Sequence, residues 1–213
     1  MMYEDRTDAF LDLISGGKSE FLTELEETAR ADRVPIIRTA VQHLLKFIIT
    51  ERKPEDILEI GSAIGFSSIL MREAGGDGLR ITTIELDEDR ANAALQNIEK
   101  AGYSDDITLI KGDAAEVIKT LDKEYDIIFL DAAKGQYPFL LSDIKRLLKK
   151  GGLLITDNCL QEGDVLESRY AVRRRDRTIH ARMREFIREI YHDEDLNTCL
   201  MPMADGVALS IKK

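Results

Sequence analysis

The feature that most constrains the fold is an alternation, from Asp56 onward, between short runs rich in β-branched residues and stretches of helical length. The helical stretches, such as 88–101 and 137–149, are rich in Ala, Leu, Glu and Lys. Strands that are apolar nearly throughout and are separated by helices predict a parallel sheet covered on both faces. We expect such strands at 56–60, 80–85, 107–112, 125–131 and 152–157.

The two ends of the chain add a β-hairpin and a set of helices to these five predicted strands. After a long charged helix at about 173–192, the runs NTCLMPM and GVALSIKK flank Ala204-Asp205-Gly206, which predicts an antiparallel β-hairpin. Before Asp56 we expect helices at about 3–14, 19–31 and 36–51, interrupted at Val34-Pro35 because the residue before proline avoids the helical region. The chain therefore reads as a single α/β domain, 1–213. A helical N-terminal extension (1–52) precedes a doubly wound, Rossmann-like core (53–213).

Composition narrows the class of protein. Of 213 residues, 44% are hydrophobic and 33% are charged, and the formal net charge of −10 argues against indiscriminate binding to nucleic acid or membranes. The two cysteines, Cys159 and Cys199, are too few for a disulfide framework or a zinc site. No apolar run approaches the roughly 18 residues of a membrane span, and the first residues lack a signal pattern. We expect a cytoplasmic globular protein with no membrane partner.

The strand ends carry the residues of a cofactor site. The first strand runs into Gly61 and Gly65, which let the backbone turn tightly against a ligand. The second ends at Glu85, a carboxylate suited to ribose hydroxyls, and Gly112-Asp113-Ala114 follows the third. Because neither G-x-G-x-x-G nor a P-loop is present, the pattern favours an adenosine that carries a cation in place of phosphates, such as S-adenosylmethionine. Each feature alone has a structural alternative; Asp113, for instance, could be a helix N-cap.

The next two strand ends carry hard oxygen ligands. The fourth strand ends at Asp131, three residues before Lys134, and the fifth ends at Asp157-Asn158. Asp131, Asp157 and Asn158 should meet on the cofactor's rim, and they favour Mg²⁺, with Mn²⁺ or Ca²⁺ as possible substitutes. A bound cation would lower the pKa of a substrate hydroxyl, and Lys134 could receive its proton. The structural alternatives are a local turn at Asp157-Asn158 and a solvated lysine.

In this order, the motifs resemble the cation-dependent O-methyltransferases, which include catechol and caffeoyl-CoA O-methyltransferases and bacterial relatives. The resemblance extends from about Val34 to Lys213 and implies a class I methyltransferase sheet and a homodimer. It implies catalytic roles for Lys134 and Asp131, with metal ligation by Asp131, Asp157 and Asn158. It implies cofactor contacts at Ile36, Glu59, Gly61, Ser67, Glu85, Asp113, Ala114 and Asp131.

Two departures from the family pattern bear on the substrate. The terminal hairpin has Ala204-Asp205-Gly206 where the family often has Gly-Asp-Gly, which we interpret as a tolerated change in the turn. After the positions of Asp157-Asn158, plant and catechol-type members of the family usually carry an aromatic residue and a glycine-rich stretch that shape an aryl pocket. This chain has Cys159-Leu160-Gln161-Glu162-Gly163 there. This replacement argues against a small phenolic substrate.

An arginine-dense segment suggests a polyanionic partner. Residues 169–188 hold eight arginines against Asp176 and Glu185, a local charge of +6 in an acidic chain. Arg173, Arg174 and Arg175 are our candidates for phosphate contacts, and Tyr170 could stack on an unpaired base. A solvated face paired with neighbouring acids is the structural alternative.

The arginine run also sharpens the resemblance, because bacterial tRNA 5-hydroxyuridine methyltransferases have a comparable run at this place. We therefore expect methylation of 5-hydroxyuridine to 5-methoxyuridine in tRNA, since the 5-hydroxyl and 4-carbonyl oxygens are vicinal and could share one cation. The alternative is a catechol-like small hydroxylated aromatic or a CoA-linked molecule, whose phosphates would also suit arginines. A binding module without catalysis is disfavoured by the intact set of Asp131, Lys134, Asp157 and Asn158.

Overall fold

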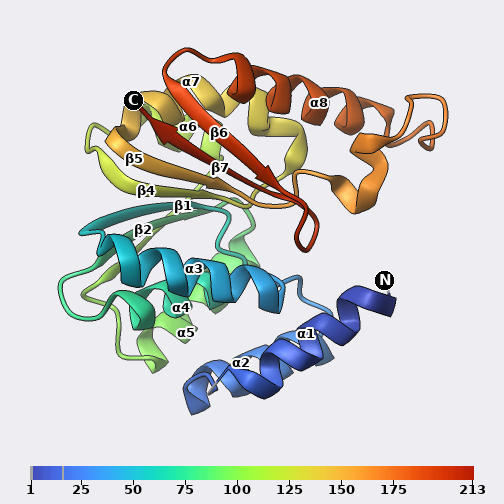
Figure 1. Ribbon diagram of the computed structural model, residues 1–213. Helices are drawn as coiled ribbons and strands as arrows, with labels where there is room; N and C mark the ends of the chain where they lie inside the picture. The colour runs from blue at the N-terminus through green and yellow to red at the C-terminus, as the bar shows by residue number, and fades with distance from the viewer. Residues whose placement is uncertain (1, 16) are drawn as a thin grey trace.

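The computed structural model describes residues 2–15 and 17–213, and its centre is one mixed sheet with the strand order β3-β2-β1-β4-β5-β7-β6 (Figure 1). The strands pair in parallel except β7, which is antiparallel to both β5 and β6. The predicted α/β fold with its C-terminal hairpin is confirmed. The bounds are β1 (Asp56–Ile60), β2 (Arg80–Glu85), β3 (Ile107–Lys111), β4 (Tyr125–Leu130), β5 (Leu148–Thr156), β6 (Leu196–Met201) and β7 (Val207–Lys212).

Helices cover both faces of the sheet, as Figure 1 shows. Successive strand residues point to opposite faces, so Ile57 joins the apolar cluster beneath α3 and α4, while Leu58 joins the cluster beneath α7 and α8. One face carries α3 (Thr39–Arg52), α4 (Phe66–Gly75) and α5 (Glu88–Lys100). The other carries α6 (Ala114–Thr120), α7 (Tyr137–Leu147) and α8 (Arg177–His192). The strand order reverses between β1 and β4, which is where such sheets bind ligands.

Three predicted boundaries differ from the structure by three residues or more. β5 begins at Leu148, not at 152, because Leu148 pairs with Tyr125 of β4 and this tertiary contact overrides the helical propensity of the lysines that follow. The third helix begins at Thr39, not at 36, so the stretch after Pro35 is irregular. The charged helix α8 begins at Arg177, so residues 173–176 lie in a turn and not on a helix.

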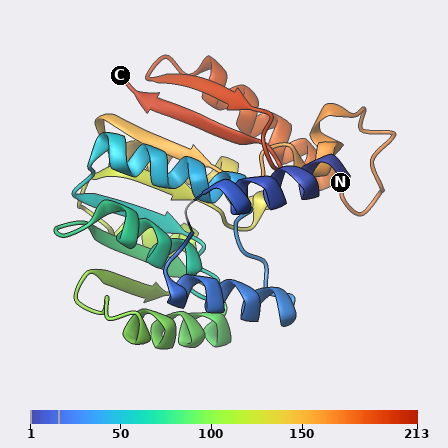
Figure 2. The same cartoon turned by 60° about the horizontal axis from the view of Figure 1, so that its bottom comes forward.

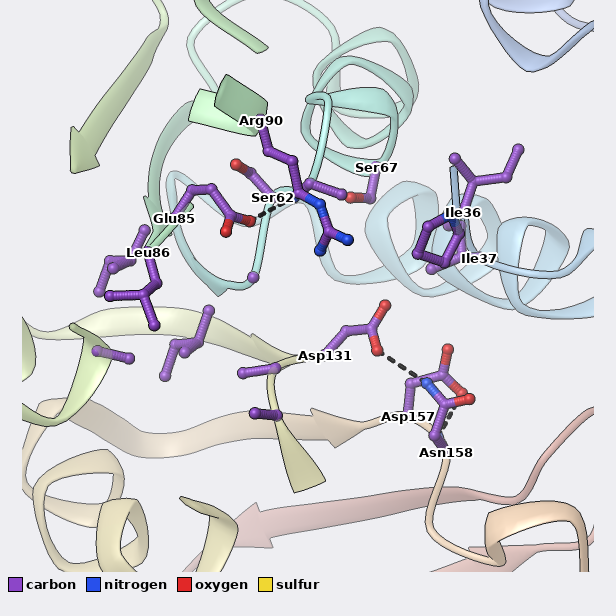
Figure 3. A pocket seen from close by; sticks show the side chains of 18 of the residues that line it. Ile36, Ile37, Ser62, Ser67, Glu85, Leu86, Arg90, Asp131, Asp157 and Asn158 are labelled. Atoms are coloured by element: carbon purple, nitrogen blue, oxygen red, sulfur yellow. Dashed lines mark hydrogen bonds between the residues drawn. The ribbon is translucent and has the colours of Figure 1, made fainter. Parts of the chain in front are cut away.

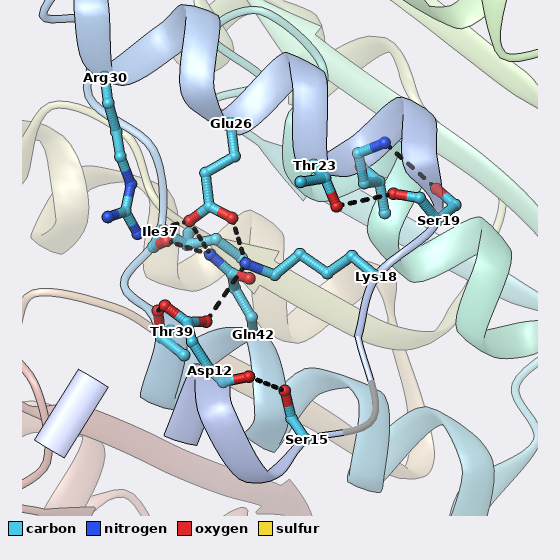
Figure 4. A network of polar contacts seen from close by, with 11 residues as sticks. Asp12, Ser15, Lys18, Ser19, Thr23, Glu26, Arg30, Ile37, Thr39 and Gln42 are labelled. Carbon is cyan, nitrogen blue, oxygen red and sulfur yellow. Dashed lines mark hydrogen bonds and ion pairs between the residues drawn. The ribbon is translucent and has the colours of Figure 1, made fainter. Parts of the chain in front are cut away.

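The N-terminal extension is held together by a polar network around Glu26 (Figure 4). α1 (Met2–Ile14) and α2 (Glu20–Ala31) precede α3, and Glu26 of α2 accepts hydrogen bonds from Lys18, Arg30 and Gln42. Burial acts to raise the pKa of Glu26, but the bonds from Lys18 and Arg30 bring it below its ordinary value. Gln42 also donates to the carbonyl of Ile37 at 3.0 Å, so the network fixes the irregular segment before α3.

The segment between β5 and α8 projects from the body of the molecule in both views (Figure 1, Figure 2). It contains the short helix η2 (Gln161–Leu166) and then residues 167–176, which we call the arginine loop. Within the described residues, no helix has the length and apolar character needed to cross a membrane.

Candidate active site

A cavity of about 720 Å³ opens at the carboxyl ends of β1, β2, β4 and β5, beside the point where the strand order reverses (Figure 3). Of the predicted site residues, the cavity wall includes Ile36, Gly61, Ser67, Glu85, Ala114, Asp131, Asp157 and Asn158. The remaining predicted residues, Glu59, Asp113, Lys134 and Arg173 to Arg175, are not part of this wall.

The glycine turn after β1 brings the backbone against the end of β4. Gly61 has a φ of +101°, and a Cβ placed there would lie 2.1 Å from the carbonyl oxygen of Asp131. Only glycine avoids this clash with a neighbouring strand end. Gly65, at φ +83°, caps the start of α4, the helix that presents Ser67 to the cavity. The turn thus needs both glycines, as the sequence predicted.

Glu85 stands at the end of β2 and is tied to the cavity's backbone. One carboxylate oxygen accepts from the N–H of Ala63 at 2.8 Å, and the other accepts from Asp87 at 2.9 Å. Each oxygen retains a second lone pair, so Glu85 can still accept from ribose hydroxyls. Beside it, Leu86 is 64% exposed and Arg90 points into the cavity (Figure 3). Leu86 and Arg90 were not predicted as site residues. The sequence feature that could have indicated Leu86 is its position, as a bulky apolar residue, directly after Glu85.

Glu59 lies beneath the cavity and does not line it. Its side chain is fully buried, and one oxygen accepts from Ser68 and from Thr83. The other oxygen has no hydrogen-bond partner among the described residues. Burial raises the pKa of Glu59 to about 7, against the neighbouring hydroxyls of Ser67, Ser68 and Thr83, which lower it. Its predicted place in the cofactor wall is therefore corrected to one behind that wall, supporting the start of α4.

Asp113 takes the helix-cap role that the sequence left open. It is the N-cap of α6, and its carboxylate accepts from the N–H of Ala115 at 2.9 Å. Gly112 and Ala114, its two neighbours, line the cavity, but Asp113 does not. One oxygen of Asp113 is thus committed to the first turn of α6, and the expected adenine contact stays a prediction for the other oxygen.

The predicted oxygen ligands meet on the cavity floor. Leu130 pairs with Thr156, so Asp131 and Asp157 leave neighbouring strand ends together. The Asn158 side-chain amide donates to Asp131 at 2.8 Å, and the Asn158 N–H donates to Asp157 at 2.7 Å. Asp157 is 3% exposed. Burial raises the pKa of both carboxyls, and the negative charge of Asp131 raises the pKa of Asp157 further.

This donor set fits a hard cation. Two carboxylates forced together in a poorly hydrated site are costly when both are ionised, and a cation between them would remove that cost. Carboxylate and amide oxygens are the ligands that Mg²⁺ and Ca²⁺ prefer. The amide of Asn158 is needed for the set, since no three His, Cys, Asp or Glu side chains in the described residues are grouped to hold a metal.

Lys134 lies beside the cavity, in the short helix η1 (Lys134–Gln136). Its Nζ donates to Asp205 at 3.1 Å, and Asp205 itself lines the cavity. On the other side of the segment, Arg182 of α8 donates to the carbonyl of Gly135 at 3.1 Å. No sequence pattern points to Asp205 or Arg182 as partners of the Lys134 segment, because each is far from Lys134 along the chain.

The structure divides the arginine-dense segment into two groups. Arg177, Arg182 and Arg184 donate to backbone carbonyls and so hold the local fold. Arg173 and Arg174 are exposed, and within the described part of the chain their side chains have no hydrogen bond or ion pair. Arg175 is exposed beside Asp176, 3.5 Å away. The predicted phosphate-binding residues are therefore among the exposed arginines whose side chains do not hold backbone carbonyls.

The strand order, the antiparallel β7 and a cavity built from a glycine turn and strand-end acids define a class I methyltransferase. A model of the O-methyltransferase family matches residues 12–213. The catechol O-methyltransferase of Mycobacterium tuberculosis is 30% identical over 165 residues, 75% of this chain and 74% of the relative. The chain belongs to the O-methyltransferase family and is an S-adenosylmethionine-dependent O-methyltransferase.

Solved structures agree with this membership. A Staphylococcus aureus protein assigned as a caffeoyl-CoA O-methyltransferase has a TM-score of 0.90 at 32% identity, covering 97% of this chain and 99% of that one. The Podospora anserina methyltransferase PaMTH1, solved with S-adenosylhomocysteine bound, has a TM-score of 0.87 at 28% identity and covers 98% and 94%. The class I methyltransferase fold expected from the sequence is confirmed.

Proposed function

We propose that this protein transfers the methyl group of S-adenosylmethionine to the 5-hydroxyl of 5-hydroxyuridine in tRNA, with Mg²⁺ held by Asp131, Asp157 and Asn158. The observation that carries the metal-dependent chemistry is the meeting of these three side chains in the cavity beside the glycine turn. The cofactor and the hydroxyl would therefore share one enclosed site, which favours reaction through positioning.

The cavity wall supplies the contacts for the cofactor. Glu85 is placed to accept from the ribose hydroxyls, and the backbone of Gly61 lines the same wall, packed against the end of β4. Ser62 has a buried hydroxyl without a hydrogen-bond partner among the described residues, and it lines the same wall. An unsatisfied buried hydroxyl is costly, so a polar ligand group is expected opposite Ser62.

The floor of the cavity prepares the hydroxyl. Mg²⁺, when bound, would stabilise negative charge on the substrate oxygen and favour two vicinal oxygens over one. Asp131 and Asp157 hold their orientation through the hydrogen bonds of Asn158. Lys134 lies in η1, after the same strand end as Asp131, and its Nζ is our candidate to receive the hydroxyl proton.

The arginine loop supports an RNA substrate. It projects from the body of the molecule (Figure 1), and Arg173, Arg174 and Arg175 are exposed to solvent. Tyr170 is 87% exposed, which suits stacking on an unpaired base. The base of the loop is fixed to α8 by Arg177 and Arg184, so the exposed arginines extend from an anchored segment.

A small-molecule substrate is the alternative, and the relatives support it. The Mycobacterium tuberculosis relative is a catechol O-methyltransferase, and the Staphylococcus aureus structure is assigned as a caffeoyl-CoA O-methyltransferase. A catechol also has vicinal oxygens, and a CoA ester carries phosphates that would suit Arg173 to Arg175. Vicinal oxygens and local charge are therefore compatible with either substrate.

Turnover separates these substrates. The protein is incubated with labelled S-adenosylmethionine, Mg²⁺ and either hydroxyuridine-bearing tRNA, a catechol panel or caffeoyl-CoA. We expect methylation of tRNA, with 5-methoxyuridine as the product nucleoside. A variant with Arg173, Arg174 and Arg175 changed to Gln should lose tRNA turnover, and a variant with Lys100, Lys111 and Lys119 changed to Gln controls for the lost charge. Turnover of catechols or caffeoyl-CoA but not of tRNA would replace the proposal with the alternative.

The homodimer implied by the family resemblance also stays a prediction. Light scattering coupled to size-exclusion chromatography should give twice the chain mass of 24.1 kDa. A monomer mass across the micromolar range would contradict it.

A further inference from the structure

The side chain of Lys134 is held by a residue from the opposite end of the chain. Asp205 accepts from Lys134 Nζ at 3.1 Å through one carboxylate oxygen, and from the backbone N–H of Glu162 through the other. Asp205 is 9% exposed and lines the cavity. Within residues 2–15 and 17–213, it is the sole hydrogen-bond partner of Lys134 Nζ. One buried carboxylate therefore joins the proposed proton acceptor to the loop that follows Asn158.

The hairpin turn between β6 and β7 is built to present Asp205 to this loop. Gly206 has a φ of +82°, and a Cβ there would lie 2.3 Å from Leu160. The N–H of Leu160 donates to the carbonyl of Asp205 at 2.8 Å, and that of Cys159 donates to Gly206 at 2.8 Å. Turn and loop are thus joined backbone to backbone, and Asp205 has little freedom to move away from Lys134.

The loop that Asp205 holds is itself strained. Asn158, Gln161 and Glu162 all have left-handed backbones, with φ values of 59°, 51° and 54°. Residues other than glycine keep such conformations only where their surroundings hold them, and these cluster at functional sites. The bond from Glu162 to Asp205 is one such restraint. The strained loop carries the candidate ligand Asn158 at its start and leads into the arginine loop.

A second restraint acts on the other side of Lys134. Arg182 donates to the carbonyl of Gly135, and its guanidinium lies 5.1 Å from the centre of the Phe139 ring. The backbone of the Lys134 segment is therefore fixed from α8, while its Nζ is held from the hairpin turn.

We propose that Asp205 is a positioning residue, which sets the place of Lys134 Nζ relative to the candidate metal ligands and couples it to the loop after Asn158. This inference rests on the proposed catalytic role of Lys134. It assigns Asp205 no contact with the substrate. Lys134 pairs with the negative charge of Asp205, whereas the N–H of Glu162 needs only a side-chain oxygen that can accept a hydrogen bond.

Asp205→Asn separates charge from shape. Asparagine keeps an oxygen that can accept from Glu162 but loses the negative charge opposite Lys134. We expect kcat to fall about tenfold or more, with the KM for S-adenosylmethionine changed less than about twofold. In a Lys134→Gln background, the same substitution should change kcat less than about twofold, because the two residues act as one unit.

Asp193→Asn is a matched control. Asp193 pairs with Lys145 at 2.6 Å, with side-chain exposures of 17% and 25%, close to the 10% and 26% of Asp205 and Lys134. It lies at the far end of α8 and should leave kcat unchanged.

A labelling experiment gives a readout that needs no turnover. Acetic anhydride modification of Lys134, followed by peptide mass spectrometry, should be several-fold faster in Asp205→Asn than in the unaltered protein or in Asp193→Asn. Unchanged Lys134 labelling would overturn the inference. Full turnover by Lys134→Gln would instead overturn the proposed role of Lys134, and equal effects of Asp205→Asn in both backgrounds would show that Asp205 acts on stability alone.

Discussion

Asn158 donates its side-chain amide to Asp131 across 2.8 Å, and it does so from a left-handed backbone with a φ of 59°. The two residues come from loops after neighbouring strands, β4 and β5. Asparagine tolerates this backbone region better than most residues. The strained backbone at Asn158 therefore places its side-chain amide nitrogen against Asp131 and its backbone N–H against Asp157, the two acids that would hold a metal ion.

Removing one carboxylate from this set should abolish metal binding. Asp157→Ala leaves Asp131 and Asn158 as two donors, too few to compete with water for Mg²⁺. We expect calorimetry to detect Mg²⁺ binding by the unaltered protein and at least about 100-fold weaker binding by the variant. Equal affinities in the two proteins would place the metal elsewhere.

The buried Glu59 should make stability depend on pH. Its pKa is raised to about 7 in the folded protein by burial, whereas the unfolded chain has the ordinary value near 4.5. Between these values the folded state keeps a proton that the unfolded state has lost, so the free energy of unfolding falls as pH rises from about 4.5 to 7. The free-energy cost of ionising the buried Glu59 is therefore absent below pH 4.5 and fully present above pH 7.

Glu59→Gln isolates this effect. Glutamine keeps an acceptor for Ser68 and Thr83 but does not ionise. Relative to this variant, the unaltered protein should lose up to about 3 kcal/mol of stability between pH 4.5 and 8. Urea unfolding at several pH values measures the difference, and a constant difference would show that Glu59 does not titrate in this range.

Gly61 should be far less tolerant of substitution than Gly78. Both have a left-handed backbone, with φ values of +101° and +94°, but a Cβ at Gly78 meets nothing within 4 Å. Gly78→Ala should therefore cost about 1–2 kcal/mol from backbone strain alone. Gly61→Ala adds a clash with the carbonyl of Asp131 and should cost more than about 3 kcal/mol or prevent folding. Similar melting temperatures for both variants would contradict the close approach at Gly61.

The hairpin turn should gain stability from the residue that the family often has there. Ala204 has a φ of 49°, a strained conformation for alanine. Ala204→Gly relieves that strain but increases the entropy of the unfolded chain, so we expect a net gain of up to about 1 kcal/mol. Differential scanning calorimetry gives the change, and a loss of stability would show that the Ala204 methyl group makes contacts worth more than the strain.

The arginine loop should control the salt dependence of RNA binding. If Arg173, Arg174 and Arg175 each contact a phosphate, changing all three to Gln should flatten the plot of log K against log salt by about 2 units. The control with Lys100, Lys111 and Lys119 changed to Gln should leave the slope as it is. Fluorescence anisotropy with labelled tRNA measures both, and an unchanged slope in the arginine variant would give the loop another role.

Much of the fold could be predicted because it depends on local patterns. Runs such as 56–60 and 80–85 are apolar and β-branched, and the structure contains strands with those same bounds. The start of β5 could not be predicted, because Leu148 is extended through pairing with Tyr125, a contact made across the sheet. The start of α8 was placed too early because charge density, not capping or periodicity, marked the segment 173–176 as helical.

The candidate site was partly predictable for the same reason. Strand-end acids such as Asp131 and Asp157 could be placed on one rim because parallel strands end on the same edge of a sheet. Which way a side chain points could not be read from order alone: Glu59 is buried behind the wall, and Asp113 caps α6. Contacts between distant segments, such as Lys134 with Asp205, are set by tertiary packing.

The most direct test of the central claim is the rate of methyl transfer with and without a chelator. Dialysed protein is assayed with labelled S-adenosylmethionine and its hydroxyl substrate, first in excess EDTA and then after Mg²⁺ is restored. The convergence of Asp131, Asp157 and Asn158 predicts negligible turnover in EDTA and full recovery with Mg²⁺ in the unaltered protein, with no recovery in Asp157→Ala. Undiminished turnover in excess chelator would contradict the metal-dependent account.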